Sequence, residues 1–345
     1  MDHRSNLRTS ALTRRHFLKL SGLSAAALSM GSLASTPLAF AKEPFPSDDI
    51  IFLIPSKPGG GHDIYARSLN PYLTKYFKEV SPGAKGGDLR IKNEPASGGL
   101  KAYSMLFNAK PNGLTIGVID TAVITDGILE KPEFDYSKLT MLLVGNYTVK
   151  VVVTSAKKGF KNWNEAMDAM KKQPVKMAAG SFGRSNHICS IIMNEKMGTK
   201  FKLINFPGTA DCLNAVLRGD VQTAFVVEDA VQSLVEAGEM RVLLSFTEAS
   251  EYPGAVSVKE LGYPELATQI SSIRFIGAPP GLEEEPKKIL LAALKKAQSD
   301  KEFVAWAKKS KYYLGNLYGS DADAVYNNFR KFYEGLAPML KKHLS

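Results

Sequence analysis

The fold of the chain can be read outward from residues 50–63, IIFLIPSKPGGGHD. Ile50–Ile54 is a short apolar run bounded by Pro55 and Gly59, which predicts a buried strand. After three consecutive glycines, apolar residues recur at helical spacing through Asp63–Phe77, which predicts an amphipathic helix. A strand, a glycine-rich loop and a helix in this order are typical of α/β sheets, whose ligands bind beyond the carboxyl ends of the strands.

The same alternation continues along almost the whole chain. Further strands are expected at Leu89–Ile91, Thr115–Ile119, Val149–Thr154, Val175–Ala179, Leu203–Phe206, Thr223–Val227 and Val242–Ser245. Helices are expected at Leu100–Asn108, Trp163–Lys171, His187–Lys196 and Ala210–Leu217, and over most of Glu285–Leu344. This alternation predicts an α/β architecture with mainly parallel sheets covered by helices.

The glycine loop at residues 58–63 has the composition of an anion site. Its glycines let the backbone approach a ligand closely, and the helix start adds free N–H groups and partial positive charge. Lys57 and His62 add positive charge, and Asp63 is a candidate N-cap of the helix. An ordinary glycine turn before a capped helix is the alternative. The spacing fits neither a nucleotide P-loop nor a dinucleotide fingerprint.

A second loop between a strand and a helix, GSFGRSNH at residues 180–187, is also polar. Ser181, Ser185 and Asn186 offer neutral hydrogen bonds, and the guanidinium of Arg184 suits a carboxylate. His187 begins the helix, where it either orients the loop or is a buried structural histidine. Two anion-receptive loops far apart in the sequence suggest two lobes facing a cleft, with one end of a dicarboxylate in each loop.

The first 41 residues indicate export. Arg14 and Arg15 precede an uncharged stretch of small and apolar residues, Leu20–Leu38, which is followed by Ala39-Phe40-Ala41. This order predicts a twin-arginine signal peptide, residues 1–41, cleaved after Ala41, and a periplasmic protein. An uncleaved membrane anchor is the alternative. No other apolar run approaches the length that spans a membrane.

Charge and cysteine content limit the classes of partner. The chain has 44 basic and 34 acidic residues, and loss of residues 1–41 leaves 39 and 33, a net charge of +6. This modest excess helps to attract small anions, but there is no dense basic cluster with interleaved aromatics that would predict a nucleic-acid site. Cys189 and Cys212 either pair in an oxidising compartment or stay free, and their spacing does not suggest a metal site.

Eight segments, in order along nearly the whole mature chain, resemble the motifs of one protein family. They are IPSKPGGGHDIYAR (54–67), NEPASGG (93–99), PNGLT (111–115), GRSNH (183–187), FPG (206–208), LRGDV (217–221), VKELGYP (258–264) and APPG (278–281). The family is that of the tripartite tricarboxylate transporter receptors, or Bug-type solute-binding proteins.

The resemblance implies a two-domain Venus-flytrap fold of the type II-like class, with residues 42–147 and 270–345 in domain I and residues 148–269 in domain II. It also implies a monomer without enzymatic activity or cofactor. The ligand would be a small carboxylate held by backbone amides, hydroxyls and waters. The partners would be the permease subunits of a tripartite secondary transporter.

The loops and the resemblance together predict a set of ligand-binding residues without any catalytic or metal-binding residue. The set is Ser56, Gly60, Gly61, His62, Asp63, Thr121, Ser181, Phe182, Gly183, Arg184, Ser185, His187, Phe206 and Gly208. The chain departs from the family pattern at Ser56, usually aromatic, at His62, usually threonine, at Phe206, usually tyrosine, and at Val226, usually acidic. Phe182, Phe206 and Arg184 suggest an anchored carboxylate and room for an aromatic body, so the ligand is expected to be a di- or tricarboxylate or an aromatic carboxylate.

Two other functions are compatible with parts of the pattern. A periplasmic adaptor that presents its ligand to a sensor kinase needs the same cleft. A hydrolase would need a dyad such as Ser185 and His187, but residues two apart at a helix start rarely face each other.

Overall fold

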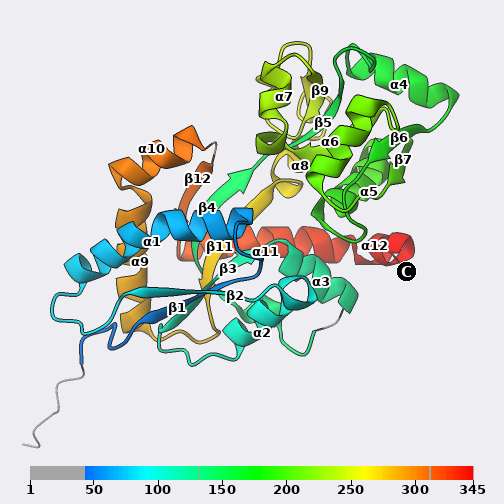
Figure 1. Cartoon of the computed structure of the whole chain (residues 1–345). Coiled ribbons are helices and arrows are strands. Elements are labelled where there is room, and N and C mark those ends of the chain that lie inside the picture. The colour runs from blue at the N-terminus through cyan, green and yellow to red at the C-terminus, as the bar shows by residue number, and fades with distance from the viewer. Residues whose placement is uncertain (1–42, 131, 311, 345) are drawn as a thin grey trace, which may run out of the picture. The chain divides into compact units, whose positions relative to one another are not determined.

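Two six-stranded mixed sheets organise the computed structural model, which describes residues 43–130, 132–310 and 312–344 (Figure 1). The predicted signal peptide, residues 1–41, lies outside the described residues. In strand order, the first sheet contains β12 (Tyr313–Tyr318), β4 (Thr140–Thr148), β11 (Ser272–Ala278), β3 (Thr115–Asp120), β1 (Ile50–Ile54) and β2 (Leu89–Asn93). The second sheet contains β10 (Val256–Ser257), β9 (Met240–Ser245), β5 (Lys150–Ser155), β8 (Thr223–Val227), β6 (Val175–Ala178) and β7 (Phe201–Ile204).

The helices fall into two groups along the chain. Those that precede β4 or follow β11 are α1 (Gly61–Val80), α2 (Leu100–Phe107), α3 (Ala122–Glu130), α9 (Glu284–Gln298), α10 (Lys301–Lys309), α11 (Ser320–Gly335) and α12 (Ala337–Leu344). Those between β5 and β11 are α4 (Trp163–Lys172), α5 (Ser185–Met197), α6 (Thr209–Arg218), α7 (Gln232–Glu236) and α8 (Pro264–Gln269). Short 3₁₀ turns are η1 (Ala96–Gly99), η2 (Tyr136–Lys138) and η3 (Glu228–Ala230).

The predicted α/β architecture is confirmed, but the strands are less parallel than expected. In the first sheet β1 pairs in parallel with β2 and β3, whereas β11 and β4, and β4 and β12, are antiparallel. A helical crossover returns the chain in the same direction and so produces a parallel pair. No such crossover within the first sheet joins β4 to β11. After β4 the chain continues directly into the second sheet, and it comes back at β11, so these two strands need not be parallel.

The chain passes between the two sheets at two places. Val149 alone separates β4 from β5, and Ile270 and Ser271 separate α8 from β11. After α11, helix α12 reaches α5, where Nε2 of His343 lies 2.9 Å from Oε1 of Glu195. The described residues therefore belong to one compact unit that begins at Glu43.

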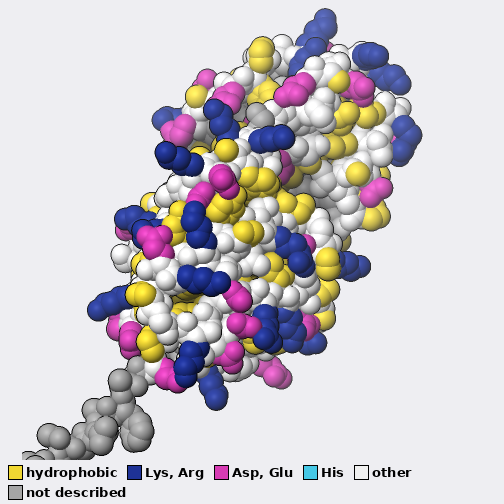
Figure 2. Space-filling model, turned by 60° about the vertical axis from the view of Figure 1, so that its left-hand side comes forward, with side chains coloured by type: hydrophobic (Ala, Val, Ile, Leu, Met, Phe, Trp, Pro, Cys, Tyr) yellow, Lys and Arg dark blue, Asp and Glu magenta, His cyan; other side chains and the backbone are white. Residues whose placement is uncertain are grey.

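Apolar burial holds both sheets to their helices. One cluster of buried residues joins β3, α2, α3 and α11 of the first group to β5, α4 and α5 of the second. A second cluster lies between α1, α9 and the first sheet, and a third between α6 and the second sheet. None of the described helices is long and apolar enough to cross a membrane. On the face seen in Figure 2, basic and acidic side chains are interspersed.

Candidate functional site

The first loop, residues 56–63, turns the chain from β1 into α1. Gly59 takes a φ of +79°, which glycine adopts without strain, and the N–H of Gly60 donates to the carbonyl of Lys57 at 3.2 Å. Helix α1 then begins at Gly61, with Gly60 as its N-cap and no side-chain cap from that residue. The first N–H groups of a helix have no partner within it, so this loop presents donors and partial positive charge.

Asp63 is not the N-cap of α1, contrary to the sequence prediction. It is the third residue of the helix, and its carboxylate reaches back to accept from the N–H of Gly59 at 2.8 Å. It also accepts from Nε of Arg67 at 2.9 Å and from Nδ2 of Asn93 at 2.9 Å. Burial raises the pKa of Asp63, but these hydrogen bonds outweigh it and the pKa lies below its ordinary value. Asp63 therefore holds the loop in place.

His62 is fixed by a carboxylate that the sequence reading did not single out. Nε2 of His62 lies 3.0 Å from Oδ2 of Asp120, at the end of β3. The other oxygen of Asp120 accepts from the hydroxyl of Tyr103 at 2.9 Å and from the N–H of Ala122 at 2.8 Å. Burial raises the pKa of Asp120, but the bond from His62 and these donors bring it down to about 2. Thr121 is buried beside this pair.

The second loop, residues 180–187, is closed by its own hydrogen bonds. The hydroxyl of Ser181 donates to the carbonyl of Pro207 at 2.8 Å, and the N–H of Gly183 donates to Nδ1 of His187 at 3.1 Å. His187 is buried, and burial followed by the charge of His343 lowers its pKa. Its Nδ1 acts as an acceptor and so orients the loop. Phe182 is 59% exposed, with its ring centroid 5.0 Å from that of His187.

The remaining predicted residues lie at helix starts beside the second loop. Ser185 is the first residue of α5, and Gly208 is the N-cap of α6. Phe206 is partly buried, and its N–H donates to the carbonyl of Gly180 at 3.0 Å. Two helix N-termini, those of α5 and α6, therefore adjoin this loop.

Arg184 joins the second loop to the elements of the first sheet. Its Nη1 lies 3.4 Å from Oδ1 of Asp126 on α3. A Cβ atom on Gly98 of η1 would lie 2.2 Å from Nη2 of Arg184, so the guanidinium rests against the bare backbone there. Burial raises the pKa of Asp126 to about 6, although the charge of Arg184 opposes the rise. A direct contact between Arg184 and a ligand stays a prediction.

A charged cluster, Asn146, Thr148, Lys150 and Arg274, lies where the two sheets meet, and the sequence reading missed all four residues. Arg274 is paired across the first sheet with Asp120 of β3 on one side and with Asn146 of β4 on the other. The buried atoms without a hydrogen-bond partner include Nδ2 and Oδ1 of Asn146, Oγ1 of Thr148, and Nε and Nη1 of Arg274. Lys150 is 1% exposed and its Nζ donates to Oδ1 of Asn186 at 2.5 Å.

Residues 85–319 match the family model described as the tripartite tricarboxylate transporter family receptor. The chain belongs to this receptor family. A curated relative from Cupriavidus necator, the "UPF0065 protein in gbd 5'region", is 26% identical over 337 residues, covering 96% of each chain.

Solved structures of low sequence identity share the fold. A TctC solute-binding protein from Polaromonas superimposes with a TM-score of 0.74 at 21% identity, covering 86% of this chain and 99% of that one. A protein of R. palustris whose structure contains adipate has a TM-score of 0.67 at 17% identity, covering 86% and 98%. The receptor therefore has the two-domain Venus-flytrap fold of periplasmic binding proteins. Members of its family are solute-binding receptors, and this chain is a receptor rather than an enzyme.

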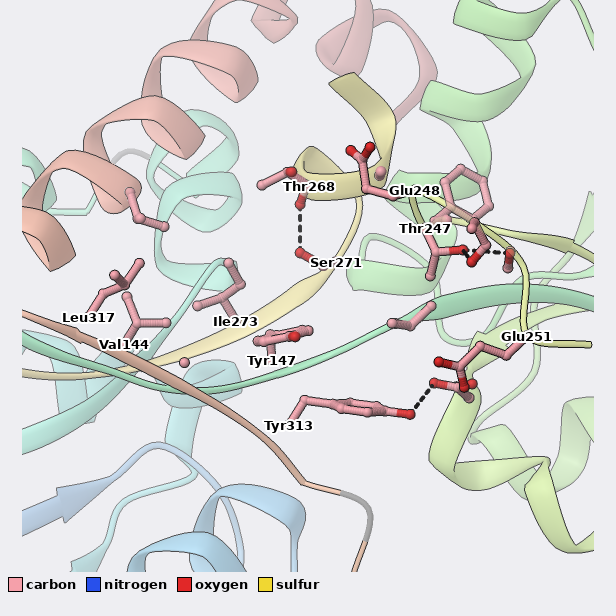
Figure 3. Close-up of a pocket in the computed structure, with 18 of the residues that line it drawn as sticks. Val144, Tyr147, Thr247, Glu248, Glu251, Thr268, Ser271, Ile273, Tyr313 and Leu317 are labelled. Carbon is pink, nitrogen blue, oxygen red and sulfur yellow. Dashed lines mark hydrogen bonds between the residues drawn. The ribbon is translucent and has the colours of Figure 1, made fainter. Parts of the chain in front are cut away.

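A cavity of about 480 Å³ lies elsewhere in the receptor (Figure 3). It is lined by the stacked rings of Tyr147 and Tyr313, by Ile273 and Leu317, and by acidic side chains that include Glu228, Glu248 and Glu251, with no Lys or Arg among its lining residues. Successive side chains of a strand point to opposite faces, so Tyr147 and Ile273 lie on the face opposite to their neighbours Asn146 and Arg274. An acid-lined cavity on that face disfavours a carboxylate.

Both cysteines are buried free thiols, so the structure does not contain the disulfide that the sequence left open. Burial raises the pKa of each thiol. Within the described residues, no group of three or more His, Cys, Asp or Glu side chains is placed to hold a metal ion.

Proposed function

We propose that this receptor captures a small carboxylate between its two loops and delivers it to the permease subunits of a tripartite secondary transporter. The observation that carries the proposal is the position of Arg184. This residue belongs to the second loop, yet its guanidinium contacts Gly98 and Asp126 among the elements of the first sheet. Gly99, the next residue after Gly98, lies against Pro55, directly before the first loop, so this contact supports an approach of the second loop to the first.

The chemistry of the two loops suits a carboxylate. Helix N-termini bind anions through free N–H groups and partial positive charge, and α1 and α5 each begin at the end of a loop. Ser181 and Ser185 add hydroxyl groups. The structure containing adipate belongs to a protein of the same fold, which favours a dicarboxylate over other small anions.

Seven of the fourteen predicted residues have one of three roles in this proposal. Gly60, Gly61, Gly183 and Ser185 supply backbone and hydroxyl donors to the ligand, whereas Asp63 and His187 hold the loops that present them. Phe182, which is exposed, provides an apolar surface for the body of the ligand.

Ligand capture in this proposal requires the two lobes to move about the two connections between the sheets. The moving parts are residues 42–147 with 270–345, and residues 148–269. A ligand favours the closed state only through contacts that it makes better there than in the open state. A carboxylate that contacts both loops meets this condition.

Export of the receptor to the periplasm through a twin-arginine signal, with cleavage after Ala41, is also part of the proposal. The family is one of periplasmic binding proteins, which supports the location. Intact-mass measurement of receptor recovered from the periplasm tests the cleavage site, since a mature chain that begins elsewhere contradicts it.

A thermal-shift screen of residues 42–345 against mono-, di- and tricarboxylates, aliphatic and aromatic, tests the function. A ligand that binds only the folded state stabilises it by about 2.7 kcal/mol at a hundredfold excess over its dissociation constant. One class of carboxylate is expected to raise the melting temperature, with a smaller shift for Arg184→Ala. Neutral sugars and amines without a carboxyl group are the control ligands, and a shift with these but with no carboxylate contradicts the proposal.

A further inference from the structure

Two cations of the charged cluster lack a carboxylate partner. Nε and Nη1 of Arg274 are buried and donate no hydrogen bond to any group of the described protein, and the bonded partner of Lys150 is the neutral amide of Asn186. Burial is the main cause that lowers the pKa of Lys150, and the charge of Arg274 lowers it further, because the two cations lie close together. The polar atoms of Asn146 and Thr148 beside them are also buried and without partners.

Such an arrangement is costly unless something else completes it. A buried charge without a partner destabilises a protein by several kcal/mol, and each unpaired buried polar group adds about 1–3 kcal/mol. Buried polar groups in native proteins are otherwise almost always hydrogen-bonded. Three neighbouring residues, Asn146, Thr148 and Arg274, break this rule together, and Lys150 beside them has only a neutral partner. This indicates a site that an anion with acceptor oxygens completes.

The two cations lie at the starts of the two loop helices. Nη2 of Arg274 would be 2.8 Å from a Cβ atom on Gly61, the first residue of α1. Lys150 bonds to Asn186, the second residue of α5. Each cation therefore lies beside the N-terminus of a helix. Arg274 adjoins the helix that follows the first loop, and Lys150 adjoins the helix that follows the second loop.

The nearby carboxylates do not neutralise both cations. Asp120 is engaged by His62, Tyr103 and Ala122. Asp229 is exposed in η3, which follows β8, and its charge raises the pKa of Lys150 and of Tyr312. It forms no ion pair with Lys150 or Arg274 in the described part of the chain. Tyr312 offers its ring to Arg274, with Cζ of the arginine 5.6 Å from the ring centroid, and supplies no negative charge.

We propose that Arg274 and Lys150 are the charged anchors of the ligand, and that the ligand is a dianion with two carboxylates. One carboxylate is held by Arg274 and the start of α1, and the other by Lys150 and the start of α5, with Asn146 and Thr148 completing their hydrogen bonds. This assignment rests on the proposed function and deepens it, because it names residues and a ligand charge that the loops alone do not specify.

Isothermal titration with unbranched dicarboxylates, malonate to suberate, and with the monocarboxylate of equal chain length tests the assignment. The variants are Arg274→Met and Lys150→Met, which keep the volume and remove the charge. Arg90→Met is the matched control, since Arg90 is exposed on β2 and pairs with Asp49. Wild type is expected to bind a dicarboxylate more tightly than its monocarboxylate partner, and each cluster variant to lose roughly 10- to 150-fold in affinity.

The melting temperature of the ligand-free variants separates loss of the site from loss of the fold. Removing an uncompensated buried charge is expected to leave ligand-free Arg274→Met at least as stable as wild type while its ligand-induced shift disappears. Unchanged dicarboxylate affinity in both cluster variants, or a preference of wild type for monocarboxylates, overturns the assignment and leaves carboxylate capture standing. If wild type binds no carboxylate, the proposed function fails. If, in addition, both variants are markedly less stable than wild type without ligand, the anion site is overturned as well.

Discussion

At the scale of single residues, Asp126 is a pH-sensitive group beside the second loop. Its carboxyl is buried against the half-exposed guanidinium of Arg184, and burial raises its pKa to about 6 from an ordinary value of 3.8. The folded state therefore holds this proton more tightly than the unfolded state, so its favourable contribution to stability is complete below about pH 4 and is lost as the pH rises through 6.

We expect Asp126→Asn to be more stable than wild type at pH 7, by about 1–3 kcal/mol, because the amide cannot ionise. The lost pairing with Arg184 costs little, since that side chain is half exposed to solvent. Urea unfolding at pH 7 and pH 4 measures the difference, which should vanish at the lower pH. A less stable variant at pH 7 would show that the ion pair outweighs burial.

The residues that the sequence reading missed share one property. Lys150 and Arg274 are each the single charged residue of a mainly apolar strand. Lys150 is the first residue of β5, KVVVTS, and Arg274 is the third residue of β11, SIRFIGA. A lone basic residue in such a run looks like one solvated position of the strand. Its burial and its place beside α1 or α5 depend on how the two sheets meet, which local sequence patterns do not encode. The glycine loops were recognisable because their composition itself signals a turn into a helix.

At the scale of elements, α1 begins in an unusual way. Gly60 provides no side-chain cap, and Asp63 takes over by bonding Gly59, Arg67 and Asn93 at once. Helix α4 begins conventionally, with Asn162 accepting from the N–H of Glu165 at 3.0 Å. The start of α1 is thus tied both to its loop and to β2, where Asn93 lies.

Asp63→Ala is expected to cost about 2–4 kcal/mol, because three donors lose a charged acceptor and all three hydrogen bonds are partly buried. Asn162→Ala is the control and should cost about 1 kcal/mol, as for an ordinary cap. Because the pKa of Asp63 is lowered, its stabilisation is present above 3.8 and fades as the pH falls through the folded value. Chemical denaturation at pH 7 would contradict this account if the two losses were equal.

The strands and helices expected before the C-terminal tail all overlap observed elements, whereas several observed elements were not expected. β1 and β8 have the predicted bounds, and α1, α2, α4, α5 and α6 differ from the expected helices by a few residues. β4, β11 and α3 were not expected, and β12 interrupts a tail that was expected to be mostly helical. β12, YLGNLY, contains glycine and asparagine and is largely exposed at the sheet edge, so it has neither the alternation nor the apolar run of a buried strand.

At the scale of the whole molecule, the proposed function depends on the approach of the second loop to η1. The order of loops and sheets followed from the sequence, but the contact of Arg184 with Gly98 and Asp126 did not, since it joins segments distant in the chain. Gly98 takes a φ of +69° and leaves space for the guanidinium. This glycine therefore has two roles: it permits the positive φ of the η1 turn, and it leaves room for the guanidinium of Arg184 from the second loop.

Gly98→Ala separates these two roles. A methyl group there must displace the end of Arg184, so we expect the ligand affinity measured by titration to fall roughly two- to fivefold, as for loss of an ion pair. The matched control is Gly262→Ala, where φ is +87° and nothing lies within 4 Å of the added Cβ. Both variants should lose about 1–2 kcal/mol of stability from a left-handed alanine, and Gly262→Ala should keep wild-type affinity. Equal affinity in the two variants would show that the second loop need not reach η1 for the ligand to be held.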